Sequence, residues 1–211
     1  MDHAQFAALA AQGYDRIPLT LETYADLDTP LSLYLKLANA PNSFLLESVV
    51  GGERFGRYSF IGLPARRLLR SRGFATEVVQ DGAVIERDDG NPLDFIERYQ
   101  QRQRVYVPPD MPRFCGGLAG YFGYDAVRYI EPRLARFDKP DEIGTPDLLL
   151  LETQELAVVD NLAGKIYLIV YVDPVAPDAY AAGQARLRTL LARLRSPLAP
   201  PAGPAGSSLS S

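Results

Sequence analysis

The stretch ATEVVQDGAVIER, residues 75–87, places two short apolar-rich runs on either side of Asp81 and Gly82. An Asp-Gly pair between two such runs is a strong short-range signal for a two-residue hairpin turn. The stretch therefore predicts a pair of antiparallel strands. Similar short runs at residues 58–61 and 67–71 precede it, so we expect an antiparallel sheet in this part of the chain.

Two further segments predict strands. Residues 147–159 and 165–172 are apolar runs that flank the turn-like sequence DNLAG at residues 160–164, which predicts a second hairpin. Residues 43–50 are also rich in apolar side chains and lead into Gly51 and Gly52. This pattern is typical of a buried strand followed by a turn.

Five segments carry the signals of helices. Thr29 and Pro30 stand where an N-cap and a first helical residue would, ahead of a leucine-rich run. In residues 177–195 leucines share one side of the predicted helix and arginines largely occupy the other. The expected helices are residues 4–11, 31–38, 92–102, 126–130 and 177–195. Together with the strands they predict an α+β fold, in which antiparallel sheets are packed with a few helices.

Composition restricts the classes of function. Of 211 residues, 47% are hydrophobic and 23% charged, and the net charge is −4, which is typical of a soluble globular protein. The mild acidity argues against nucleic acid or an anionic membrane as a partner. No stretch reaches the roughly 18 apolar residues of a membrane span, so we expect a cytoplasmic protein. One cysteine, Cys115, and one histidine, His3, exclude internal disulfides and leave almost no route to a zinc cluster.

The last residues differ in composition from the rest. Residues 196–211, SPLAPPAGPAGSSLSS, are dominated by Pro, Ala, Gly and Ser. Such a segment has too little apolar surface to offset the entropy of ordering it. We therefore expect a folded unit at residues 1–195 and a linker or disordered tail at residues 196–211.

One motif suggests a binding site. Glu47 and Ser48 follow the apolar run FLL at residues 44–46, so a carboxylate and a hydroxyl would project from a strand end. Such a pair could bind a small zwitterion, with Glu47 facing its ammonium group. From spacing alone, however, an ordinary strand end with solvated polar residues is the favoured interpretation. The glycines at 117, 120 and 123 match no phosphate-binding pattern and instead indicate close approach of another backbone.

Several segments taken together resemble the N-terminal region of anthranilate synthase component I, a member of the chorismate-utilising enzyme superfamily. The resemblance extends over residues 14–173, less than half of a complete family member. Its specificity comes from the order and spacing of the segments. They are FLLES at residues 44–48, RYSFIG at 57–62, GGLAGYFGYD at 116–125, and Pro146-Asp147 leading into Val158-Val159-Asp160.

The resemblance implies a function for the complete protein. The family converts chorismate to anthranilate in tryptophan biosynthesis, using Mg²⁺ and ammonia from a glutamine amidotransferase, component II. Its catalytic and metal-binding residues lie in a C-terminal catalytic domain whose motifs are absent here. We therefore expect no catalytic residue, no metal ligand and no cofactor in this chain, and no synthase activity from it alone. Two alternatives are the N-terminal part of aminodeoxychorismate synthase component I and a stand-alone, non-catalytic amino-acid-binding module.

The resemblance also implies a feedback site for L-tryptophan in residues 1–195, and so reverses the interpretation favoured for Glu47 and Ser48. In the family, part of this pocket comes from the C-terminal domain, so we expect this chain alone to bind tryptophan weakly or not at all. The matching effector-binding residues are Leu46, Glu47, Ser48, Tyr58, Ser59 and Leu149.

Overall fold

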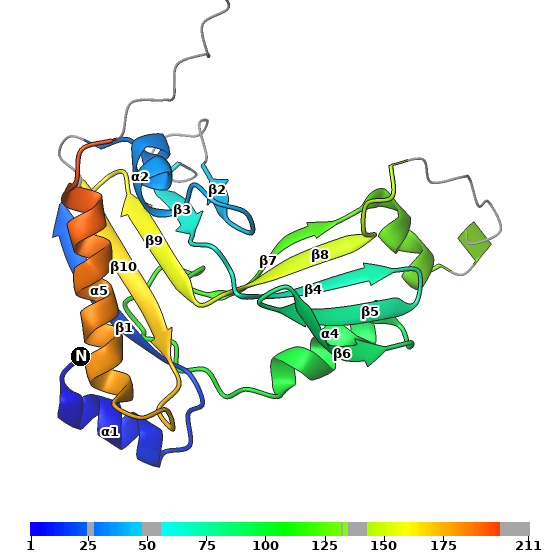
Figure 1. The fold of residues 1–211 in the computed structure, drawn as a ribbon, viewed down its shortest axis with the longest axis horizontal. Helices are drawn as coiled ribbons and strands as arrows, with labels where there is room; N and C mark the ends of the chain where they lie inside the picture. Colours follow the sequence, from blue (N-terminus) through cyan, green and yellow to red (C-terminus); the bar gives the residue numbers. More distant parts are fainter. Residues whose placement is uncertain (25–27, 48–55, 132, 135–142, 199–211) are drawn as a thin grey trace, which may run out of the picture.

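The computed structural model describes residues 1–24, 28–47, 56–131, 133–134 and 143–198. They form two five-stranded antiparallel sheets that lie side by side, with helices against each (Figure 1). The predicted α+β fold is therefore confirmed. The last helix ends at Arg195. Most of residues 196–211 lies outside the described part, so the linker or tail expected there stays a prediction.

The first sheet has the strand order β1-β10-β9-β3-β2. Three helices pack on one of its faces (Figure 1). The strands are β1 (Ile17–Tyr24), β2 (Phe44–Leu46), β3 (Tyr58–Gly62), β9 (Glu155–Asp160) and β10 (Lys165–Val172). The helices are α1 (His3–Ala11), α2 (Pro30–Leu37) and α5 (Ala179–Arg195).

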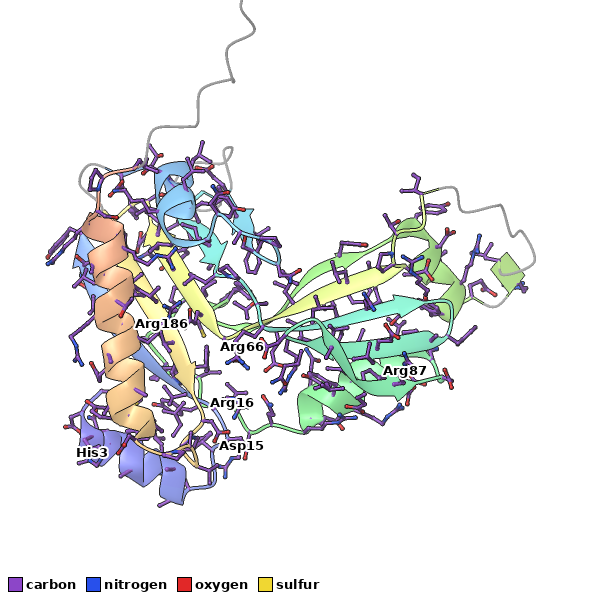
Figure 2. The ribbon with its side chains drawn as sticks, in the orientation of Figure 1. His3, Asp15, Arg16, Arg66, Arg87 and Arg186 are labelled. Carbon is purple, nitrogen blue, oxygen red and sulfur yellow. The ribbon has the colours of Figure 1, made fainter. Side chains whose placement is uncertain are left out.

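The helices carry the sequence signals that predicted them. Thr29 accepts a hydrogen bond from the backbone N–H of Ser32 at 3.1 Å and caps α2. Helix α5 buries its leucine side against the sheet, and Leu187 and Leu190 are at most 1% exposed. On its polar side Arg186 forms a two-bonded ion pair with Glu155 of β9 at 2.6 and 2.7 Å (Figure 2). Apolar burial and this ion pair together fix α5 on the sheet.

The second sheet has the strand order β6-β5-β4-β8-β7. Asp81 and Gly82 both have positive φ, 49° and 85°, as a two-residue hairpin turn between β5 and β6 requires. Phe95 and Leu150 lie in the core between this sheet and its helices. The elements are β4 (Arg67–Arg72), β5 (Ala75–Gln80), β6 (Ala83–Asp88), β7 (Gly117–Phe122), β8 (Leu148–Thr153), helix α4 (Pro92–Gln101) and the 3-10 helix η1 (Tyr124–Tyr129).

Three predictions about strands need correction. Residues 58–61 and 67–71, expected in the same sheet, form β3 in the first sheet and β4 in the second. The run at residues 147–159 is not one strand: it divides at Gln154 into β8, which lies in the second sheet, and β9, which lies in the first. No Gly or Pro separates the two halves, and the only local sign of the crossing is the polar sequence ETQE at residues 152–155. The described part of the strand predicted at 43–50 contains the short edge strand β2, in which Leu46 is 51% exposed, because β2 pairs only with β3. Residues 48–50 of this prediction lie outside the described residues.

The crossing carries an unsatisfied polar group. Thr153, the last residue of β8, is 4% exposed, and its hydroxyl is the one fully buried side-chain oxygen or nitrogen without a hydrogen-bond partner among the described residues. Burying such a group costs free energy that an apolar side chain of the same shape avoids.

We therefore expect Thr153→Val to stabilise the chain by about 1–3 kcal/mol, measured as a higher urea midpoint with an unchanged slope. Thr20→Val on β1, at a partly exposed position, is the matched control and should change stability much less. A lower midpoint for Thr153→Val would show that the hydroxyl has a partner.

Candidate functional site

A groove of about 470 Å³ lies between the edge strand β2 of the first sheet and strands β7 and β8 of the second. Leu46 and Leu149, both predicted as effector-binding residues, line this same groove. They are far apart in sequence and belong to different sheets. The other lining residues are Ser43, Phe44, Phe114, Leu118, Ala119, Gly120, Tyr121, Phe122, Leu150 and Leu151.

Strand pairing decides which predicted residues face the groove. Leu46 lies opposite Phe60 of β3, so the two share a sheet face, and Tyr58 follows on that face two residues away. Tyr58 packs near Phe60, with ring centroids 6.2 Å apart, but it does not line the groove. Ser59 points to the opposite face, is fully buried, and accepts a hydrogen bond from the side chain of Asn161 at 3.1 Å. The structure therefore does not bring Tyr58 and Ser59 into the groove.

The polar end of the motif is described only in part. Glu47 directly follows Leu46, is exposed, and makes no hydrogen bond or ion pair with any described residue. Ser48 lies outside the described residues. Of the predicted set, the structure thus joins Leu46 and Leu149 in one groove, and Glu47 directly follows Leu46 without lining the groove.

The glycines at 117, 120 and 123 favoured a strand and turn, but the sequence did not place this strand in the wall of the groove. Strand β7 pairs with β8 so closely that a Cβ at Gly120 would collide with the carbonyl oxygen of Leu149. This agrees with the interpretation of the glycine series as a place of close backbone approach. Tyr121 is held to the wall by donating a hydrogen bond to the carbonyl of Pro146 at 3.1 Å. The continuous run LAGYF at residues 118–122 was the available signal for this wall.

The turn after β9 fixes the start of β3. Arg57 binds the carboxylate of Asp160 with its Nε and Nη2 at 3.2 and 2.8 Å. Asn161 donates from its side chain to the carbonyl of Gly56 at 3.1 Å. Because residues 56 and 57 lead into β3, these contacts fix where the chain enters the strand that pairs with β2.

Asp160 is a buried carboxylate, 1% exposed, whose charge is compensated by these contacts. Burial alone would raise the pKa of the Asp160 carboxyl. Hydrogen bonds from Arg57 and from the backbone N–H groups of Ala163 and Leu162 outweigh burial and lower the pKa below its usual value. The folded state therefore binds a proton at this position less readily than the unfolded chain does.

The sign of this shift gives a pH prediction. The stabilisation by ionised Asp160 is fully present above the unfolded pKa of about 3.9 and is lost as the pH falls through the lower folded value. We expect Asp160→Asn to lower the free energy of unfolding at pH 7. The difference in unfolding free energy between the variant and the parent chain should become smaller below about pH 4, measured by urea unfolding at a series of pH values. Asp173→Asn, at a carboxylate whose side chain is 44% exposed, is the control. A loss of unfolding free energy that is the same at every pH would contradict the lowered pKa of Asp160.

Metal binding was tested on the same residues. In the part of the chain that the structure describes, no three His, Cys, Asp or Glu side chains come together as a metal ion requires. The residues present here therefore do not fit a Mg²⁺ site, and we derive no chemical step through one. A search of the described helices also finds none with the length and apolar character needed to cross a membrane.

Known proteins share this two-sheet architecture and its motifs. No family model matches the chain. It is 55% identical over 204 residues to "Anthranilate synthase component 1" of Pseudomonas aeruginosa, covering 96% of this chain and 42% of the relative. It is 56% identical over 200 residues to the protein of the same name from Neisseria meningitidis serogroup C, covering 93% of this chain and 41% of the relative.

A solved structure agrees with these relatives. The crystal structure of anthranilate synthase component I from Streptococcus pneumoniae aligns with a TM-score of 0.53 and 27% identity, over 84% of this chain and 37% of that one. The fold is thus that of one part of a component I subunit. The chain belongs to the anthranilate synthase component 1 family, and it spans about two fifths of the length of the curated relatives it matches.

Proposed function

We propose that this chain is the N-terminal, regulatory part of an anthranilate synthase component I. The complete protein would convert chorismate and ammonia to anthranilate and pyruvate in the cytoplasm. A C-terminal catalytic domain would supply the catalytic residues and the Mg²⁺ site, and a glutamine amidotransferase, component II, would supply the ammonia. The names of the relatives and the share of their length that the chain matches support this proposal, and they favour anthranilate over aminodeoxychorismate as the product.

We further propose that the groove between β2 and β7–β8 holds the side chain of L-tryptophan as feedback inhibitor. The observation that carries this proposal is that Leu46 and Leu149, predicted from separate motifs, line one groove. Phe44 and Leu151 extend its apolar wall, which suits an indole ring. Glu47, which directly follows Leu46 and is exposed, would face the ammonium group. Ser48 would add its hydroxyl at the carboxylate end.

A comparison of the free energies of burial and of association indicates that this chain alone would bind tryptophan weakly. Burying an aromatic side chain removes 150–250 Å² from water, which contributes roughly 4–6 kcal/mol. Association and side-chain ordering cost a comparable amount or more, about 4–15 kcal/mol. Contacts from the catalytic domain would supply the remaining free energy. An inhibitor held between β2 and β7–β8 would favour one arrangement of the two sheets, and this difference in affinity is what feedback regulation requires.

The absence of synthase activity is directly measurable. Purified chain incubated with chorismate, Mg²⁺ and an ammonium salt should show no increase in anthranilate fluorescence above a blank without protein. Addition of a separately produced catalytic domain of a close relative provides the positive control. Anthranilate formed by the chain alone would contradict the proposal that the catalytic residues lie in a separate C-terminal domain.

Tryptophan binding tests the groove itself. Calorimetric titration should give a dissociation constant no tighter than about 1 mM, while NMR at millimolar L-tryptophan should shift the amide signals of Leu46 and Leu149. Leu149→Glu should remove these shifts, and Leu162→Glu, on an exposed turn, should leave them unchanged. Shifts confined to residues outside the groove would refute the site. Micromolar binding abolished by Ser48→Ala would show instead that the pocket is complete without the catalytic domain.

A further inference from the structure

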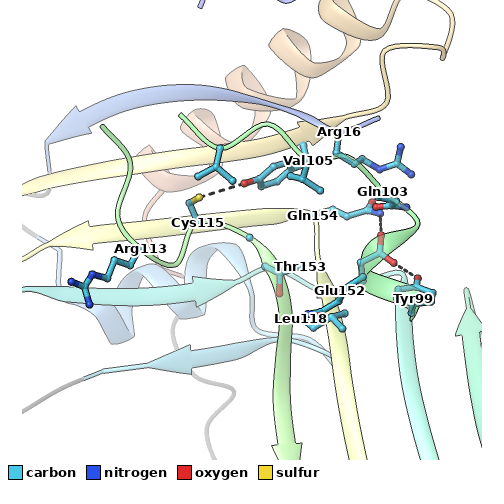
Figure 3. A pocket seen from close by; sticks show the side chains of 15 residues that line it. Arg16, Tyr99, Gln103, Val105, Arg113, Cys115, Leu118, Glu152, Thr153 and Gln154 are labelled. Carbon is cyan, nitrogen blue, oxygen red and sulfur yellow. Dashed lines mark hydrogen bonds between the residues drawn. The ribbon is translucent and has the colours of Figure 1, made fainter. Parts of the chain in front are cut away.

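A second cavity, which we call the junction cavity, lies where the two sheets meet and has a volume of about 290 Å³ (Figure 3). It is bounded by the crossing between β8 and β9, by Tyr171 of β10, by the end of α4 and by the segment that leads into β7. Its lining residues are Arg16, Tyr99, Gln100, Gln103, Val105, Val107, Arg113, Cys115, Gly116, Gly117, Leu118, Glu152, Thr153, Gln154 and Tyr171.

The wall of the junction cavity is partly apolar. Leu118 contributes a half-buried aliphatic side chain, and Val105 and Val107 contribute exposed ones, 41% and 59% exposed. The Tyr171 hydroxyl and the Cys115 thiol lie 3.5 Å apart and satisfy each other, so Tyr171 presents chiefly its ring. An apolar cavity of about 150 Å³ is enough to hold benzene. At about 290 Å³, the junction cavity can hold a six-membered ring together with a short substituent.

The acidic group in the wall is already compensated. Glu152 accepts a hydrogen bond from the Tyr99 hydroxyl at 2.5 Å and another from the Gln154 side chain at 2.7 Å (Figure 3). Arg67 lies 3.4 Å from the same carboxylate. Burial, and then the bond to Glu152, raise the pKa of Tyr99 to about 12, so the hydroxyl stays protonated and keeps donating at neutral pH. Glu152 therefore has little capacity left to bind a cationic ligand.

The two arginines in the wall differ in whether their charge is compensated. Arg16 forms an ion pair with Asp173 at 3.1 Å and donates to the carbonyl of Asp15 at 2.7 Å. Arg113 is exposed and forms no ion pair or hydrogen bond with any described residue. In Figure 3 it lies on the opposite side of Cys115 from the Glu152–Tyr99 pair. Among the described residues of the wall, the uncompensated charge is thus a single positive one at the rim.

Two neutral polar groups in the wall also lack partners. The buried hydroxyl of Thr153 has none, and the half-buried side chain of Gln103 makes no hydrogen bond to a described residue. Buried polar groups are otherwise almost always paired in native proteins. Unpaired groups around an apolar cavity are a common property of ligand sites.

We propose that the junction cavity binds a small organic carboxylate. Its ring or aliphatic body would lie among Val105, Val107 and Leu118, and its carboxylate would stay at the solvent-facing rim beside Arg113. This orientation follows from the high cost of burying a charge without a partner. Because the wall includes residues of both sheets, a bound molecule would stabilise their relative arrangement. The site is separate from the groove that we assign to tryptophan.

The test uses the 211-residue chain and benzoate as the probe, with benzamide and benzylamine as neutral and cationic analogues. Benzoate should bind saturably, raise the midpoint of thermal unfolding and shift the amide signals of Gly116, Gly117 and Gln154. Benzamide should bind about three- to fivefold more weakly, which corresponds to the loss of one solvent-exposed charge pair, and benzylamine more weakly still.

Two variants and a control locate the site. Arg113→Gln should reduce benzoate affinity by about three- to fivefold and leave benzamide binding unchanged. Val107→Phe should reduce the binding of both by filling the cavity. Arg188→Gln removes an exposed arginine from α5 and should change neither. The proposal is overturned if benzoate and benzamide bind equally, if Arg113→Gln and Arg188→Gln behave alike, or if the shifted signals belong to the groove around Leu46 instead.

Discussion

The fold depends on one constraint, which is that residues 148–160 serve two sheets at once. Strand β8 is paired on both sides, with β4 and β7, and β9 is paired on both sides, with β10 and β3. Gln154 between them accepts a backbone hydrogen bond from Tyr171 at 2.9 Å and donates from its side chain to Glu152 at 2.7 Å. The crossing is therefore tied by hydrogen bonds to β10 of the first sheet and to Glu152 of β8 in the second.

Both candidate binding regions are consequences of this crossing. The groove lies between an edge strand of one sheet and the last two strands of the other, and the junction cavity lies at the crossing itself. Neither would exist within one sheet, because each takes its walls from both. A ligand in either region would therefore act on the geometry that β8 and β9 set, and the regulatory role proposed for this part of the protein would depend on that effect.

Local sequence signals predicted most helices, strands and turns. They failed where the structure depends on which distant strands pair. Asp81-Gly82, Thr29-Pro30 and the leucine stripe of α5 each specify a turn, a cap or a buried face within a few residues. The division at Gln154 is marked only by four consecutive polar residues, 152–155, which do not specify that the strands on either side join different sheets. In the groove, resemblance identified Leu46 and Leu149. It could not exclude Ser59, whose direction depends on the pleat and on the partner strand.

Leu118 of β7 lines both the groove and the junction cavity. This residue of β7 thus lies where the groove proposed for an indole and the cavity proposed for a small acid come closest together. If both proposed ligands contact it, occupancy of one region would change the surroundings of the other, and the two binding events would be thermodynamically linked.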